Sequence, residues 1–182
     1  MNDNDPKPVE LLAVDVETTG LDPGRDRILE IAMRTLDARL EETDRLHLVI
    51  RWNGEPSDRI RRMHGANGLL AACASPDASD PGRAAARAAA FTARHAAGHR
   101  LLPFGSTVGF DRRMLDAFDP TILAPCTHRS LDLSSLMEAV RLWIPDMEPD
   151  CERTTDHRAS HCLDDTIRQG RAYRRLLASC AA

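Results

Sequence analysis

The chain has 182 residues, of which 42% are hydrophobic and 29% are charged, and its formal net charge at pH 7 is −4. This size and composition predict one soluble globular domain. A net negative chain has no global field that attracts nucleic acid, so a polyanion would have to be held by local basic groups or by metal ions. No run of 18 apolar residues predicts a membrane span, and the polar start of the chain does not resemble a secretory signal.

The five cysteines are irregularly spaced, and no Cys-x-x-Cys pair occurs. An odd number of cysteines without regular spacing is a poor framework for disulfides. We therefore expect reduced thiols, no membrane partner and a cytoplasmic location.

The apolar patterns predict a single α/β domain over residues 11–179, preceded by a disordered lead at 1–10. Three strands are expected first, at 11–17, 28–37 and 46–50, and their short links suggest an antiparallel meander.

Helices and short strands are expected to alternate over the rest of the chain. Gly98 stands where a helix C-cap belongs, and Ser135 with Glu138 matches a capping box. The order predicts a mixed five-stranded sheet with flanking helices. The expected elements are helical pieces over 60–73, a loop at 75–82, helices at 83–98, 108–118, 134–143 and 160–178, strands at 101–104 and 130–133, and a loop at 144–156.

Two carboxylates, Asp15 and Glu17, stand near the end of the first expected strand, in LLAVDVETTG. Residues i and i+2 of a strand share a face, so the two acids project together and Val14 and Val16 point to the other side. Two buried carboxylates repel each other unless a positive charge lies between them, and a hard divalent cation with oxygen ligands provides it. A solvated strand end with two harmless acids is the alternative.

Further acids are predicted at helix starts. Asp111 should fall in the first turn of the helix at 108–118, and Asp164 and Asp165 should open the last helix. The helix dipole favours a carboxylate at such a position, so each of these acids also has a purely structural explanation.

Together these acidic elements resemble the DEDD superfamily of 3′-to-5′ exonucleases. Its first motif, Asp-x-Glu-x-Thr, is matched by Asp15, Glu17 and Thr19, and DVETTGLDPGRDRILEIA is similar to the oligoribonucleases of its His-type branch. The segments GFDRRML (109–115) and SLDLSSL (130–136) are similar to two further segments of that family.

The resemblance implies a ribonuclease H-like fold and hydrolysis at the 3′ end of short single-stranded nucleic acid, with RNA favoured over DNA. Two divalent cations, Mg²⁺ or Mn²⁺, would clamp the attacking and leaving oxygens. Asp15, Glu17 and Asp165 would hold the ions, and Asp111 would support the second one. A histidine would accept the proton of the attacking water.

The third motif of this branch, His-x-Ala-x-x-Asp, is broken here. Aligning the family's Leu-Asp-Asp with Leu163–Asp165 places Ser160 at the histidine position. His161 precedes Asp165 by one helical turn, which puts the two side chains on one face. We therefore favour His161 as the general base. His157 is the alternative, because a short insertion could let its His-Arg-Ala triplet occupy the catalytic place.

The resemblance also implies residues that contact the substrate. Leu21 resembles the apolar residue that wedges against the terminal bases, and His64, in HGANGL, resembles a family histidine near the sugar or phosphate. Ser106 and Thr107 stand where family members usually carry Asn before the hydroxyl residue, and a hydroxyl can still hydrogen-bond phosphate. The full set is Thr18, Thr19, Leu21, His64, Ser106, Thr107 and Arg129.

Three alternatives remain open. A zinc site could form from Cys151, His157, His161 and Cys162, which supply two thiols and a His-x3-His pair. A non-catalytic nucleic-acid-binding module of the same fold would explain the broken third motif. A DNA-directed exonuclease would use the same chemistry. The resemblance also makes a homodimer possible.

Overall fold

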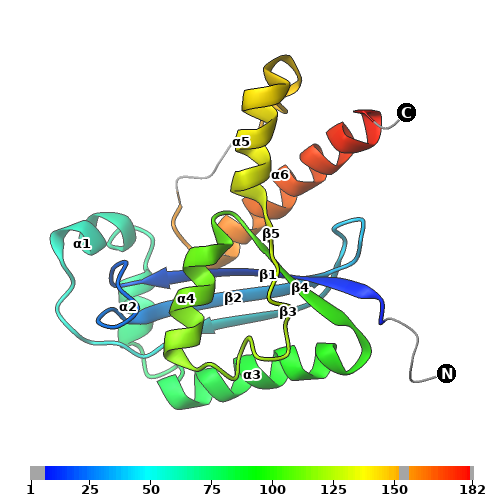
Figure 1. Ribbon diagram of the computed structural model, residues 1–182. Helices are drawn as coiled ribbons and strands as arrows, with labels where there is room; N and C mark the ends of the chain where they lie inside the picture. Colours follow the sequence, from blue (N-terminus) through cyan, green and yellow to red (C-terminus); the bar gives the residue numbers. More distant parts are fainter. Residues whose placement is uncertain (1–6, 152–155, 181–182) are drawn as a thin grey trace.

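The computed structural model describes residues 7–151 and 156–180. Five strands form one sheet in the order β3-β2-β1-β4-β5, so the first strand lies at its centre (Figure 1). β1 pairs antiparallel with β2 and parallel with β4. The strands are β1 (Val9–Thr18), β2 (Ile28–Leu36), β3 (Glu42–Val49), β4 (Arg100–Gly105) and β5 (Leu131–Asp132).

Helices cover both faces of this sheet: α3 runs along one face, and α5 and α6 rise from the other (Figure 1). None of the helices in the described part of the chain has the length and apolarity that a membrane crossing needs. The helices are α1 (Asp58–His64), α2 (Leu69–Ala74), α3 (Pro81–Gly98), α4 (Val108–Phe118), α5 (Leu133–Trp143), the 3-10 turn η1 (Pro145–Met147) and α6 (Ala159–Cys180).

The alternation of β1 divides the core into two apolar clusters. Even-numbered residues such as Leu12 and Val14 pack with Phe91 of α3, whereas Ala13 packs with Leu163 of α6 on the opposite face. Successive side chains of a strand point to opposite faces, so the sequence of β1 alone decides which residues face α3 and which face α6.

The expected mixed five-stranded sheet with flanking helices is confirmed. The expected disordered lead at 1–10 is wrong at its end, because β1 begins at Val9 and buries Glu10; residues 1–6 lie outside the described residues. β3 begins at Glu42, earlier than expected, because its polar alternation carries no apolar signal for the strand edge.

Three expected helix boundaries are also corrected. The capping box of Ser135 and Glu138 is not used, since Asp132 caps α5 by accepting a hydrogen bond from the Ser135 N–H at 3.3 Å. Gly98 is the last residue of α3, and His99 follows as its cap. The last helix starts at Ala159, so Asp164 does not open it but lies beyond its first turn.

Candidate active site

Asp15 and Glu17 lie near the carboxyl end of β1 and project toward α6, as the strand pattern predicts. Cys162 of α6 joins them, and one ligand atom from each of the three residues lies within 4.8 Å of the other two. The Cys162 sulfur lies 3.8 Å from Glu17 Oε1. Among the described residues, neither Asp111 nor Asp165 belongs to this closest group.

Burial and mutual repulsion dominate the electrostatics of the carboxylates at this point. Burial, followed by repulsion from Glu30, raises the pKa of Glu17 to about 8. The pKa of Asp15 is also raised, first by burial and then by the charges of Asp111 and Glu17. Burial raises the pKa of Asp111 to about 7, although a hydrogen bond from the backbone opposes the shift. The raised pKa values mean that these acids favour binding a proton or a cation.

Asp111 is placed by the junction of β4 and α4. Thr107 takes a left-handed conformation with φ of 59° and ends the turn, which leaves Asp111 in the first turn of α4, as expected. The backbone N–H of Val16 donates to Asp111 Oδ1 at 3.0 Å. This bond ties the start of α4 to β1.

Asp164 and Asp165 are neighbours with different surroundings. Asp164 is exposed, and its Oδ1 lies 2.6 Å from Arg34 on β2. Asp165 is buried, and its carboxylate contacts Arg168 one turn further along α6. Of these two acids, Asp165 is the one that faces the same side of α6 as Cys162. Its charge contributes to the raised pKa of the Cys162 thiol.

Glu30 fixes the start of α6 next to the acidic cluster. It is fully buried and stands directly opposite Glu17 in the β1–β2 ladder. Its carboxylate accepts hydrogen bonds from Arg158 and from the backbone N–H of Ala159, and His47 Nε2 lies 2.7 Å away. Burial alone would raise the pKa of Glu30, but these bonds lower it to about 2.

The pairing of Glu30 with Arg158 is not among the sequence-based predictions. Two signals were available: a glutamate in the middle of the apolar run ILEIA, and an arginine directly before the last helix. A charged residue inside a buried strand requires a partner, but the sequence does not say which one.

The two candidate bases lie at the start of α6. The ring of His161 is 52% exposed, and its Nδ1 lies 2.7 Å from Asp156 Oδ2. His157 is exposed, and its carbonyl accepts a hydrogen bond from Asn67. Within the described part of the chain, Cys162 rather than a histidine of α6 contacts the acids of β1. Burial and the neighbouring acids raise the pKa of the Cys162 thiol, which therefore stays neutral.

His64 lies deeper than a surface substrate contact would. Its side chain is fully buried, and its Nε2 lies 3.4 Å from Glu17 Oε2. Burial lowers the pKa of His64, so the ring is neutral near pH 7. The structure therefore brings this ring to the acidic cluster itself.

The residues after β1 form a turn that presents one apolar side chain. The Thr18 hydroxyl donates to the carbonyl of Gly20 at 2.5 Å, and the Thr19 hydroxyl bonds Asp26 at 3.1 Å. Leu21 projects from this turn with 61% of its surface exposed. The threonines thus hold the turn together, and Leu21 is free to meet a ligand.

A second polar group gathers between β4 and the start of α5. Ser106 and Thr107 lie 3.0 and 3.1 Å from the hydroxyl of Ser134. Arg129, which precedes Ser134 by five residues in the sequence, is exposed, and its carbonyl accepts a hydrogen bond from Arg112. Hydroxyl and guanidinium groups of this kind can bind phosphate oxygens.

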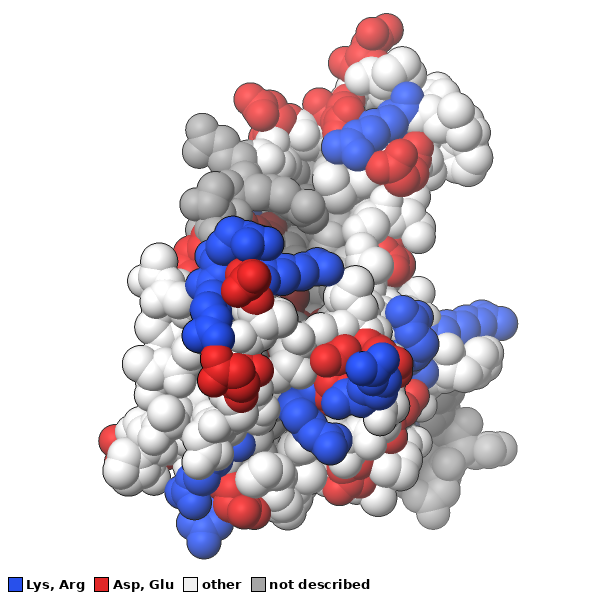
Figure 2. All heavy atoms as spheres, turned by 90° about the vertical axis from the view of Figure 1, so that its left-hand side faces the viewer, with Lys and Arg blue, Asp and Glu red and all other residues white. Residues whose placement is uncertain are grey.

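The face at the carboxyl end of β1 carries several Arg side chains beside acidic ones (Figure 2). One cavity near α1, of about 570 Å³, is lined by Arg59 and Arg62 and by His157 and Asp156. This cavity provides local basic groups on a chain whose net charge is negative.

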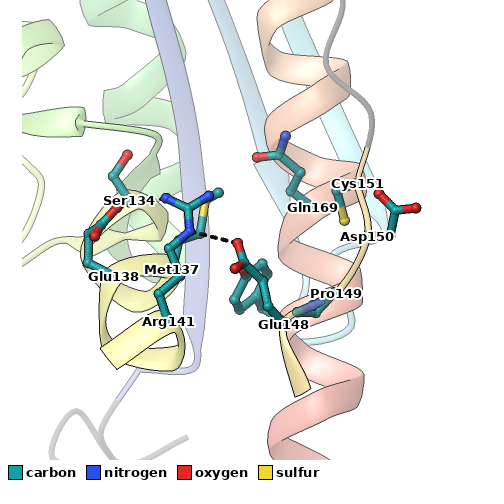
Figure 3. Close-up of a pocket in the computed structure, with 10 residues that line it drawn as sticks. Ser134, Met137, Glu138, Arg141, Glu148, Pro149, Asp150, Cys151 and Gln169 are labelled. Carbon is teal, nitrogen blue, oxygen red and sulfur yellow. Dashed lines mark hydrogen bonds and ion pairs between the residues drawn. The ribbon is translucent and has the colours of Figure 1, made fainter. Parts of the chain in front are cut away.

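Another cavity, of about 510 Å³, opens between α5 and α6 (Figure 3). Arg141 Nε donates to Glu148 at 2.7 Å across it, and Cys151 and Gln169 also line it. The acids of β1 do not line this cavity, so we do not assign the chemistry to it.

The residues of the expected zinc site separate in the structure. Cys162 faces Glu17, His161 faces Asp156, and Cys151 lines the cavity between α5 and α6. The described residues do not bring these side chains together as one group of metal ligands.

Known proteins that are similar to this chain over most of its length are exonucleases. The family model described as Exonuclease (RNase_T) matches residues 12–168. An oligoribonuclease from Halorhodospira halophila is 30% identical over 177 residues, which cover 91% of this chain and 92% of the relative. An oligoribonuclease from Sodalis glossinidius is 31% identical over 186 aligned positions, with 96% of each chain covered.

Solved structures share the fold at lower identity. E. coli exonuclease I in complex with a dT13 oligonucleotide matches with a TM-score of 0.65 and 18% identity over 94% of this chain and 43% of that one. Exonuclease I from Methylocaldum szegediense matches with a TM-score of 0.65 and 16% identity over 92% and 40%. The chain thus spans about two fifths of the length of these structures.

Proposed function

The chain belongs to the exonuclease family and is a 3′-to-5′ exonuclease, and we propose that it hydrolyses short single-stranded RNA with two Mg²⁺ or Mn²⁺ ions. Relatives named oligoribonuclease, similar over nearly their whole length, support the choice of RNA. The observation that carries the proposal is the group formed by half-buried Asp15 and buried Glu17 and Asp111, whose pKa values are all raised.

These residues fit divalent cations. Carboxylate oxygens are the ligands that Mg²⁺ and Mn²⁺ prefer, and the raised pKa values reflect a charge that a cation would neutralise. Asp15 and Glu17 are the proposed principal ligands, with Asp165 from α6 and Asp111 from α4. When bound, the ions supply Lewis acidity and offset the charge of the phosphodiester.

His161 is the proposed general base, and His157 is the alternative. Asp156 lies next to Nδ1 of His161 and can hold the proton there, which leaves Nε2 free to accept one from water. The ring stands one turn of α6 before Asp165. The neutral thiol of Cys162 is the poorer base, because its raised pKa keeps its proton in place.

The substrate would cross the carboxyl end of β1. The exposed side chain of Leu21 is the proposed contact to a terminal base, and the hydroxyls of Ser106 and Thr107 with Arg129 are the proposed contacts to a phosphate. His64, which lies beside Glu17, is a further proposed contact. Thr18 and Thr19 take part by holding the turn that presents Leu21.

A degradation assay on end-labelled oligomers tests this proposal. RNA and DNA of graded length, labelled at the 3′ or the 5′ end, are incubated with Mg²⁺ or Mn²⁺ and with wild type, His157→Ala or His161→Ala. We expect stepwise shortening from the 3′ end, faster on short RNA than on DNA, and strong loss of activity in His161→Ala alone.

Each contrary outcome has its own meaning. Faster cleavage of DNA would overturn the choice of RNA. Loss of activity only in His157→Ala would transfer the role of base to His157, and full activity in both variants would remove both assignments. Binding without cleavage under all conditions would favour the non-catalytic module.

A homodimer and a cytoplasmic location stay predictions from the family resemblance and the cysteine pattern. Light scattering of the purified chain at several concentrations measures the first, and fractionation of producing cells measures the second.

A further inference from the structure

A group of histidines and acids lies at the other end of the sheet from the catalytic carboxylates. Glu10 stands near the start of β1, and His95 and His99 lie at the end of α3. At about 3.3 Å per strand residue, Glu10 is roughly 16 Å along the strand from Asp15. Glu10 also points toward α3, whereas Asp15 points toward α6, so the two groups occupy opposite faces as well as opposite ends.

The ligand atoms of this group already have the spacing of a metal site. Glu10 Oε2 lies 2.9 Å from His95 Nδ1 and 3.4 Å from His99 Nδ1. One ligand atom from each of the three residues lies within 4.8 Å of the others. In a tetrahedral zinc site with bonds of about 2.0–2.1 Å, ligand atoms stand about 3.3 Å apart. The distance to His99 matches this spacing, and the hydrogen-bonded contact to His95 would have to open by about 0.4 Å to accept an ion.

The neighbours of the group hold the ligands in place. The second ring nitrogen of His95, Nε2, lies 3.1 Å from Asp44 Oδ2, which fixes the orientation of the ring. Nδ1, which here hydrogen-bonds Glu10 Oε2 at 2.9 Å, is the nitrogen that would bind an ion in place of that bond. The Thr43 hydroxyl donates to Glu10 Oε1 at 2.8 Å, so Oε2 is the oxygen left for an ion. Such outer partners are typical of histidine–metal sites.

The group is buried at Glu10 and His95 and reaches solvent at His99. The side chain of Glu10 is 6% exposed and that of His95 is 14% exposed, whereas His99 is 41% exposed at the rim. Two imidazoles and one carboxylate, with an open fourth position for water, form a ligand set that suits Zn²⁺ better than Mg²⁺. We propose that Glu10, His95 and His99 bind a zinc ion that joins β1 to the end of α3, separately from the catalytic ions.

Zinc binding is measured on the full chain carrying Asp15→Asn and Glu17→Gln, which removes the main ligands of the catalytic site. Equilibrium dialysis with Zn²⁺ and metal analysis should give one zinc per chain, and Zn²⁺ should raise the Tm. Adding His99→Ala should weaken binding at least tenfold, and adding Asp44→Asn should weaken it by roughly 10–100-fold. His128→Ala removes a surface histidine elsewhere on the chain and should change nothing.

Substitution with Co²⁺ identifies the ligands. A tetrahedral spectrum without a thiolate charge-transfer band is expected, and it should be lost in the His99→Ala chain. Equal zinc binding with and without His99, a thiolate band, or no zinc bound at all would each overturn the proposal. Because His99 lies at the rim, its truncation leaves the core intact, and circular dichroism of each variant checks this.

Discussion

Glu17 and Glu30 face each other across β1 and β2, and both are buried, yet their surroundings have opposite effects. Glu30 receives bonds from Arg158, Ala159 and His47, and its pKa falls to about 2. Glu17 has a neutral thiol and further acids around it, and its pKa rises to about 8. The same residue type, buried in neighbouring strands, thus fixes the start of α6 when it lies in β2 and is a proposed cation ligand when it lies in β1.

The difference shows how a buried charge can be assigned a role. A carboxylate whose partners are all present in the chain contributes to folding, because its bonds exist as soon as the chain folds. A carboxylate whose burial is not compensated within the chain weakens folding and is a candidate for a binding or catalytic role. Glu30 belongs to the first kind, and we propose that Asp15, Glu17 and Asp111 belong to the second.

The largest expected effect comes from removing one uncompensated charge. Asp15→Asn should lower kcat about 10³-fold, because an amide is a poor ligand for the cations that offset the phosphodiester charge. The same variant should have a higher Tm than wild type in EDTA, since it removes a buried repulsion. Single-turnover assays and thermal unfolding measure the two effects, and a lower Tm in EDTA would contradict the comparison.

Removing the compensated charge should have the opposite effect on stability. Glu30→Gln leaves Arg158 without its ionic partner and should lower the free energy of unfolding by about 3–5 kcal/mol. Urea unfolding measures the loss. Glu55→Gln is the matched control, because it removes an exposed pair with Arg61 and should cost less than about 1 kcal/mol. Equal losses in both variants would show that Glu30 is no anchor.

Without metal, the free energy of unfolding should depend on pH through both Glu17 and Glu30. The folded-state pKa of Glu17 is above its unfolded value, so its burial destabilises the chain increasingly as pH rises from about 4.5 to 8. The folded-state pKa of Glu30 is below its unfolded value, so its contribution is complete above about 4.5 and is lost toward pH 2.

Stability in EDTA should therefore pass through a maximum near pH 5, with changes of a few kcal/mol on either side. Urea unfolding across this range measures the curve. Saturating Mg²⁺ should flatten its alkaline limb in wild type, whereas a chain carrying Asp15→Asn and Glu17→Gln should lack most of that limb with or without Mg²⁺. A wild-type curve in EDTA that keeps rising from pH 5 to pH 8 would contradict the raised pKa values.

The smallest expected effect separates two adjacent acids. Asp164→Asn breaks an exposed pair with Arg34 and should cost less than about 1 kcal/mol, with little change in kcat. Asp165→Asn should abolish most activity, since Asp165 is the buried member of the pair. A steady-state assay of the two variants decides the point, and equal activity would remove Asp165 from the proposed ligands.

The sequence determined the order of the elements and the main acids of the site. Alternation along β1 placed Asp15 and Glu17 on one face, and the start of α4 placed Asp111, because strand and helix periods are local properties of the chain. The resemblance of the acidic motifs to a known family predicted the exonuclease, which the comparisons confirmed.

Only the tertiary structure decided what surrounds these acids. It brought Arg158 to Glu30 and Cys162 to Glu17 across more than a hundred residues, and it placed His95 next to Glu10. Such contacts depend on the register of the sheet and on the rotation of α6 and α3 against it, which no local pattern specifies. The pKa of a buried carboxylate follows from those neighbours, so its role emerges only when the chain is folded.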